Sequence, residues 1–132
     1  MRDSSSGTPM ADLSVLVKGA LESGDLDSYS DLLAPDVQWG PPGDASPPCQ
    51  SRRQVLEWYA RGQRQGRLAR NVEVAPKGSK LLVSMEVSSS DASGTRRWID
   101  RWQVLSVEKG RITDIRGYES RADAIAALET GP

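Results

Sequence analysis

The chain has 132 residues, a formal net charge of -1, one cysteine and no histidine. This length suits a single domain, a lone cysteine cannot form an internal disulfide, and the lack of histidine excludes Ser-His-Asp catalysis and His-ligated metals. Because charges of both signs are balanced and no long apolar run occurs, we expect a cytoplasmic protein with no nucleic-acid partner, membrane segment, metal or cofactor.

The first part of the chain shows helical periodicity. Residues 1–9 are mostly small and polar and predict a flexible tail, which is followed by one domain over residues 10–130. Apolar residues recur at helical spacing between Leu13 and Leu21, which predicts the first helix. Gly24 follows the last of them and is expected to end that helix.

Two more helices and a short strand are expected before the sequence changes its period. Asp25 is placed to cap a second helix, and Pro35 would stop it. Alternation over residues 37–39 favours a strand, and the proline-rich segment after it predicts an irregular loop. Ser51 and Gln54 have the spacing of a capping box at the start of the third helix.

The later part of the chain alternates with a period of two, which is typical of strands. This alternation predicts four strands, over residues 72–74, 81–88, 98–107 and 112–118, and a closing helix over residues 120–128. Helices followed by a run of antiparallel strands define the α+β class. We expect a cone, in which a mixed but mainly antiparallel sheet curves around three N-terminal helices.

Asp100 is the most informative single residue. Strand alternation places it on the same face as Trp98 and Trp102. If that face is the interior one, the apolar surroundings would favour the neutral carboxyl group, which can donate a hydrogen bond or shuttle a proton. The alternative is that this face lies outside, or that Asp100 pairs with an arginine such as Arg116.

All four tryptophans fall at positions that are expected to point inward, namely Trp39, Trp58, Trp98 and Trp102. Because the chain contains no phenylalanine, these rings could serve simply as core filler. Four large rings in one small domain nevertheless favour a lined apolar pocket, which is how most small-molecule sites are built.

Two further polar residues are candidates for the same site. Tyr59 lies next to Trp58 and could offer its hydroxyl group, although a half-buried core tyrosine is an equal alternative. Glu119 shares its alternation with Ile115 and Gly117, so it could face the interior near the rim. A solvated carboxylate at a strand end is the alternative for Glu119.

Several segments together resemble the nuclear transport factor 2-like superfamily. Residues 20–27 and 32–37 resemble its opening, residues 57–60 its third helix, and residues 98–102 and 110–118 its last two strands. This superfamily includes ketosteroid isomerases, SnoaL-like polyketide cyclases and limonene epoxide hydrolase-like enzymes. The resemblance implies a cystatin-like α+β cone with a pocket between helices and sheet, often within a homodimer.

The resemblance also carries implications for single residues. In ketosteroid isomerases the strand aspartate that donates to the oxyanion matches Asp100, which implies that Asp100 faces the pocket. Trp58 and Tyr59 match a pocket aromatic residue and a hydrogen-bonding tyrosine. The general base of those enzymes falls at Pro41 and their oxyanion tyrosine at Val17, so steroid isomerisation by that mechanism is not expected.

The leading hypothesis is a SnoaL-like protein that binds an apolar or polycyclic small molecule, as a cofactor-independent isomerase or polyketide-type cyclase. Asp100 would be its acid or base, and Tyr59 and Glu119 auxiliary polar groups. The residues expected to line the pocket are Val17, Trp39, Trp58, Met85, Val87, Trp98, Trp102, Ile115 and Gly117. The alternatives are a non-catalytic ligand-binding or dimerisation module and, third, an enzyme that acts on epoxides through Asp100 and Glu119.

Overall fold

The computed structural model describes residues 9–90 and 92–129, so the tail predicted for residues 1–9 lies, except for Pro9, outside the described residues. The elements in chain order are α1 (Met10–Ser23), α2 (Leu26–Ser30), β1 (Leu33–Gly40), α3 (Arg52–Arg64), β2 (Ala69–Lys77), β3 (Lys80–Ser90), β4 (Arg96–Glu108), β5 (Arg111–Tyr118) and α4 (Arg121–Glu129). Among these helices, none is long and apolar enough to cross a lipid bilayer.

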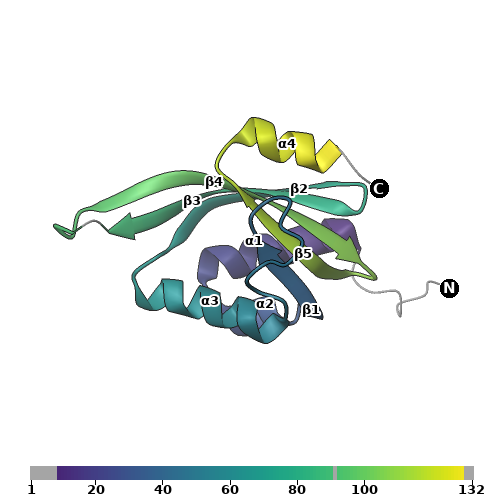
Figure 1. The fold of residues 1–132 in the computed structure, drawn as a ribbon, viewed down its shortest axis with the longest axis horizontal. Helices are drawn as coiled ribbons and strands as arrows, with labels where there is room; N and C mark the ends of the chain where they lie inside the picture. The colour runs from purple at the N-terminus through teal and green to yellow at the C-terminus, as the bar shows by residue number, and fades with distance from the viewer. Residues whose placement is uncertain (1–8, 91, 130–132) are drawn as a thin grey trace.

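The five strands form one sheet in the order β1-β5-β4-β3-β2. β1 pairs with β5 in parallel, and the other neighbours are antiparallel. Helices α1, α2 and α3 lie on one face of the curved sheet and α4 lies on the other (Figure 1). The predicted α+β class, with a mixed, mainly antiparallel sheet curved around three helices, is therefore confirmed.

The ends of the first two helices follow the predicted chemistry. Gly24 adopts φ 72°, and its N–H donates to the carbonyl oxygen of Ala20 at 3.0 Å, which ends α1. The Asp25 carboxylate accepts the N–H of Ser28 at 3.2 Å and caps α2. Helix α2 ends at Ser30, before it reaches Pro35, which lies inside β1. The observed strand is therefore longer than the three residues that were predicted.

The predicted capping box of α3 is formed in a modified way. The Ser51 hydroxyl accepts the N–H of Gln54 at 3.2 Å, as expected. The Gln54 side chain, however, accepts the N–H of Gln50 at 2.7 Å. A capping box would return this bond to the N-cap residue itself, so here it is shifted back by one residue and holds the end of the proline-rich loop.

A hydrophobic core fills the space between α1–α3 and the inner face of the sheet. Its largest fully buried side chains include those of Leu13, Leu33, Leu81, Leu105 and Ile112. Helix α4 packs against β3, β4 and β5 on the outer face, where the Lys77 ammonium lies 3.2 Å from the Glu129 carboxylate. The sheet is therefore covered on both faces, and its central strand carries apolar residues on both.

Gly40 lies where the proline-rich loop folds back on β1. A methyl group added to it would meet Pro47 Cβ at 2.5 Å and Pro48 Cδ at 3.1 Å. We expect Gly40→Ala to lower the free energy of unfolding by about 1–3 kcal/mol, since rigid proline rings cannot yield cheaply. Urea denaturation measures this, with Gly19→Ala as the control, because nothing lies within 4 Å there and helix propensity favours alanine by roughly 1 kcal/mol. Equal stabilities of the two variants would contradict the prediction.

Candidate functional site

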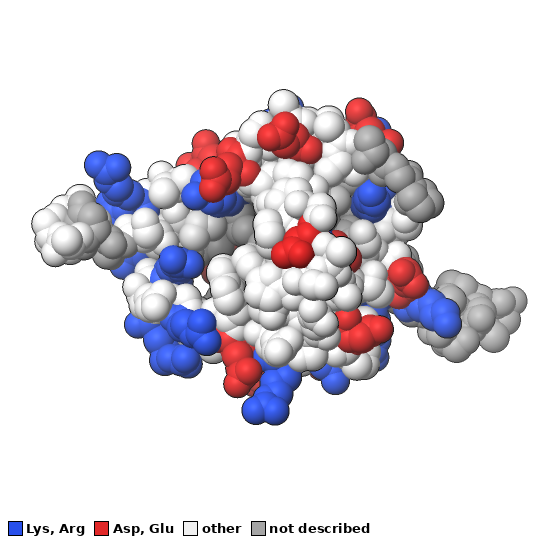
Figure 2. Space-filling model, in the orientation of Figure 1, with Lys and Arg blue, Asp and Glu red and all other residues white. Residues whose placement is uncertain are grey.

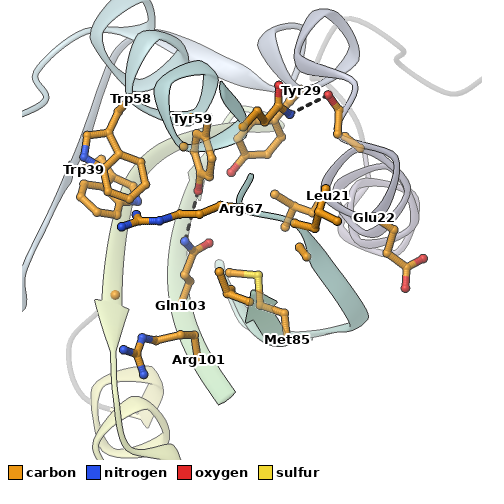
Figure 3. A pocket seen from close by; sticks show the side chains of 18 of the residues that line it. Leu21, Glu22, Tyr29, Trp39, Trp58, Tyr59, Arg67, Met85, Arg101 and Gln103 are labelled. Atoms are coloured by element: carbon orange, nitrogen blue, oxygen red, sulfur yellow. Dashed lines mark hydrogen bonds between the residues drawn. The ribbon is translucent and has the colours of Figure 1, made fainter. Parts of the chain in front are cut away.

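A cavity of about 640 Å³ opens between the three N-terminal helices and the inner face of the sheet. This volume is in the range of small-molecule sites. Its walls come from α1, α2, β1, α3, the α3–β2 loop and strands β2 to β5. Figure 3 shows the side chains converging on it, with aromatic rings on one side and Leu21 and Met85 on another.

Four aromatic rings from three different elements form one cluster in the wall. The rings of Trp39 and Trp58 lie 4.2 Å apart and are tilted by 36°. Tyr59 meets Trp58 edge-on at 5.6 Å and Tyr29 edge-on at 5.5 Å. Such edge contacts are favoured by the charge distribution of aromatic rings and hold each ring in place. Trp39, Trp58 and Tyr59, all expected from the sequence, are thus brought together at the cavity.

The Tyr59 hydroxyl is the polar centre of this cluster. It accepts a hydrogen bond from Gln103 Nε2 at 3.1 Å (Figure 3). Burial raises the pKa of Tyr59 above its usual 10.0, and the hydrogen bond from Gln103 is the largest influence that opposes this rise. Tyr59 therefore keeps its proton at neutral pH and can donate a hydrogen bond into the cavity.

Three buried polar atoms around Tyr59 have no hydrogen-bond partner within the described residues. They are Tyr29 Oη, Trp39 Nε1 and Gln103 Oε1. Tyr29 and Gln103 are only 1% and 6% exposed, respectively. A buried polar atom without a partner costs about 1–3 kcal/mol, so each exception calls for an explanation. All three residues line the cavity, where a ligand oxygen or amide could supply the missing partners.

The structure corrects the expected orientation of β4. Residues paired across two strands point to the same face, and the register places Met85 opposite Arg101 and Val83 opposite Gln103. The interior face therefore carries Arg101 and Gln103. Asp100 lies on the outer face, is exposed, and does not line the cavity. The prediction that Asp100 faces the interior is wrong.

The neighbours of Asp100 show why sequence periodicity misassigned this face. Trp98 also lies outside, where the Arg70 guanidinium stacks over its ring at 3.8 Å from the centroid. Arg70 pairs at the same time with Glu86, which is the strand partner of Asp100. The alternative partner Arg116 instead pairs with Asp114 at 3.0 Å. Tryptophan covered by an arginine on an outer face gives the same alternation as tryptophan in a core.

The other expected lining residues divide into two groups. Met85, Val87, Gly117 and Glu119 line the cavity, and the Glu119 side chain is exposed. Trp102 also borders the cavity, although its position in the strand is on the outer face with Asp100.

Val17 and Ile115, by contrast, are fully buried in the hydrophobic core and do not line the cavity, so this part of the prediction is wrong. Both positions carry branched apolar side chains that pack between helix and sheet. Because Asp100 is outside and Glu119 is at the cavity, the pair of carboxylates expected for epoxide chemistry is not assembled in one site.

Four functional candidates escaped the sequence analysis: Tyr29, Arg67, Arg101 and Gln103. Arg101 and Gln103 could have been found by weighing the second face of the 98–107 strand, which alternates equally well. Tyr29 occupies the apolar stripe of a short helix and resembles core filler. Nothing in the local sequence marks Arg67, which reaches the cavity from the α3–β2 loop (Figure 3).

Glu22 also borders the cavity, but its carboxylate is already engaged. It accepts hydrogen bonds from Lys18 Nζ at 3.0 Å and from the N–H of Val72 at 3.1 Å. The bond from Lys18 is the main cause of a lowered Glu22 pKa, with the Val72 amide second. Within the described residues, no group of three or more Cys, Asp or Glu side chains is placed to hold a metal ion.

Comparison with known families agrees with this architecture. Residues 16–115 match the SnoaL-like domain family. Because this match spans most of the chain, the protein belongs to the SnoaL-like family, within the nuclear transport factor 2-like fold. No protein of curated function matches the chain in sequence.

Solved structures with the same fold share little sequence with it. A candidate polyketide cyclase from Xanthomonas campestris superimposes with a TM-score of 0.67 at 19% identity, over 90% of this chain and 96% of the other. TerC, crystallised with polyporic acid, gives 0.68 at 15% identity over 93% and 100%. An epoxide hydrolase-like protein from M. tuberculosis gives 0.63 at 19% identity over 89% and 86%. At these identities the likeness establishes the fold alone.

Proposed function

We propose that this protein binds a planar, largely apolar small molecule of the polyketide type, and that Tyr59 and Gln103 hold one of its carbonyl or hydroxyl oxygens. The observation that carries this proposal is the set of unpartnered polar atoms on Tyr29, Trp39 and Gln103 around the Tyr59 hydroxyl. In an otherwise apolar wall, such groups orient a ligand and give specificity. The SnoaL-like membership and the polyketide cyclase neighbours support the same ligand class.

The same donors favour a second candidate, a cofactor-independent isomerase or cyclase. Protonated hydroxyl and indole groups aimed at a carbonyl oxygen stabilise the negative charge that develops when a neighbouring carbon loses its proton. In this version Tyr59 donates to the enolate oxygen. Glu119 is the carboxylate at the cavity that remains available as a proton acceptor, since Glu22 is held by Lys18. Asp100 has no part in it, because its side chain is on the outer face.

Tyr59→Phe tests both candidates. Titration of β-tetralone, an enolisable bicyclic ketone, should quench the fluorescence of Trp39 and Trp58 in the wild type. We expect the Phe variant to bind about 5- to 10-fold more weakly, as for the loss of one hydrogen bond. Asp100→Asn, the matched control, should bind unchanged. In D₂O, NMR should show exchange of the ketone's α-protons, slowed in Tyr59→Phe, if the protein is an enzyme. If no exchange is observed, the isomerase or cyclase candidate is wrong and only the binding function remains.

Three outcomes would contradict these expectations. Loss of binding in Asp100→Asn together with unchanged binding in Tyr59→Phe would overturn the proposed site. The absence of binding by the wild type up to the solubility limit of the ketone would overturn the proposed function. Exchange that is lost in Asp100→Asn would return the acid/base role to that residue.

A further inference from the structure

Two arginines reach the cavity without a carboxylate partner. Arg67 comes from the α3–β2 loop and Arg101 from the inner face of β4, and both line the cavity. Among the described residues, neither forms an ion pair, and the ion pairs found involve other side chains. Arg101 donates from Nη1 to the neighbouring Asp100 carbonyl oxygen, at 3.1 Å. Arg67 is exposed and Arg101 is half-buried, so both guanidinium groups are accessible to an anion at the cavity.

Within the described residues, the two carboxylates of the cavity form no ion pair with these arginines. Glu22 is engaged by Lys18 and by the Val72 amide, and Figure 3 shows its carboxylate directed away from the cavity. Glu119 is exposed at the cavity wall. The cavity thus combines two guanidinium groups, of which Arg67 is exposed and Arg101 half-buried, with buried neutral polar groups.

The surface next to the cavity has the same sign. Basic side chains gather over the C-terminal end of α3 and the β3–β4 hairpin (Figure 2). Arg61 and Arg64 lie in the last turn of α3, and Arg96 donates to the Gly66 carbonyl oxygen at 3.2 Å. A local surplus of one sign raises the concentration of oppositely charged ligands at the entrance.

We propose that the ligand is a planar aromatic anion, whose acidic group binds between Arg67 and Arg101 while its rings stack in the aromatic cluster. This inference rests on the proposed function and adds the charge class of the ligand. In Figure 3 both guanidinium groups point to the side of the cavity formed by Trp39 and Trp58, and Leu21 lies on the other side. Guanidinium groups suit a carboxylate or an acidic enol because they donate two parallel hydrogen bonds and stack on aromatic rings.

The test compares β-naphthoate with its neutral methyl ester by isothermal titration calorimetry. We expect the wild type to bind the acid at least about tenfold more tightly than the ester, because charge-assisted hydrogen bonds exceed neutral ones. Arg67→Gln and Arg101→Gln should each remove most of this preference and leave the affinity for the ester unchanged. Arg111→Gln, which alters an exposed arginine at the start of β5 that does not line the cavity, is the matched control. Added salt should weaken the binding of the acid and leave the binding of the ester unchanged.

The outcomes separate this inference from the proposed function. Equal affinities for acid and ester, or variants that retain the preference for the acid, would overturn the inference that the ligand is an anion. The proposed binding site would still stand. If neither naphthoate compound binds while β-tetralone does, the anionic class is wrong and the proposed function stands. If none of the three binds, both fall. Thermal melting of each variant shows that the loss is not due to unfolding.

Discussion

Gly117→Leu is expected to weaken ligand binding by at least about tenfold in Kd, without a loss of stability. Gly117 lies on the inner face of β5 directly opposite Gln103. A Cβ atom added there meets nothing within 4 Å, and the backbone is not in the left-handed region that requires glycine. A leucine side chain would therefore extend into the open cavity and occupy the place of a ligand next to the polar centre.

The expected stability follows from the same geometry. Glycine in a strand interior costs roughly 0.5–1 kcal/mol relative to a residue with a side chain, so the free energy of unfolding of Gly117→Leu should be equal to that of the wild type or slightly higher. Binding is measured by calorimetry and stability by urea denaturation. Gly19→Leu is the matched control, since Gly19 also has free space around it but does not line the cavity. A Gly117→Leu protein that binds as the wild type does would show that ligands are bound elsewhere.

Gln103→Leu is the second change with a large expected effect. Gln103 is buried, donates to Tyr59, and leaves its Oε1 without a partner in the described part of the chain. A buried unsatisfied acceptor costs about 1–3 kcal/mol, and an apolar group of similar shape removes that cost. Because the hydrogen bond to Tyr59 is lost as well, we expect the free energy of unfolding to stay constant or rise by up to ~1 kcal/mol. Binding should fall by about tenfold.

A double-mutant cycle makes this prediction specific. Tyr59 and Gln103 are taken to act on the same ligand oxygen, so their effects on binding should not add. The double variant Tyr59→Phe/Gln103→Leu should bind about as weakly as the weaker of the two single variants. Additive losses would mean that the two side chains contact different parts of the ligand. A Gln103→Leu protein that is several kcal/mol less stable would mean that the glutamine serves the fold and not the site.

The secondary structure and its order were determined by local sequence. Helix ends at Gly24 and Asp25 were predicted correctly because left-handed backbone and N-cap bonds depend on residues adjacent in the chain. The period-two segments became strands in the expected order, and segments at suitable spacing sufficed for the SnoaL-like assignment. Trp58 and Tyr59 both lie at the cavity because they are consecutive residues of the same helix, α3.

Which face of β4 points inward was decided only by the tertiary structure. Ile99, Leu105 and Val107 alternate on one face and Trp98 and Trp102 on the other, so the sequence supports both orientations.

The strand register, and the packing of α4 on the outer face of the sheet, then select one of these two orientations. Shifting a strand by one residue would reverse every side chain, and the pairing of Met85 with Arg101 settles the matter in favour of arginine and glutamine. The polar centre has the same origin. Tyr29, Tyr59 and Gln103 come from α2, α3 and β4, far apart in sequence, and only the packing of helices onto the curved sheet brings their hydroxyl and amide groups to one cavity.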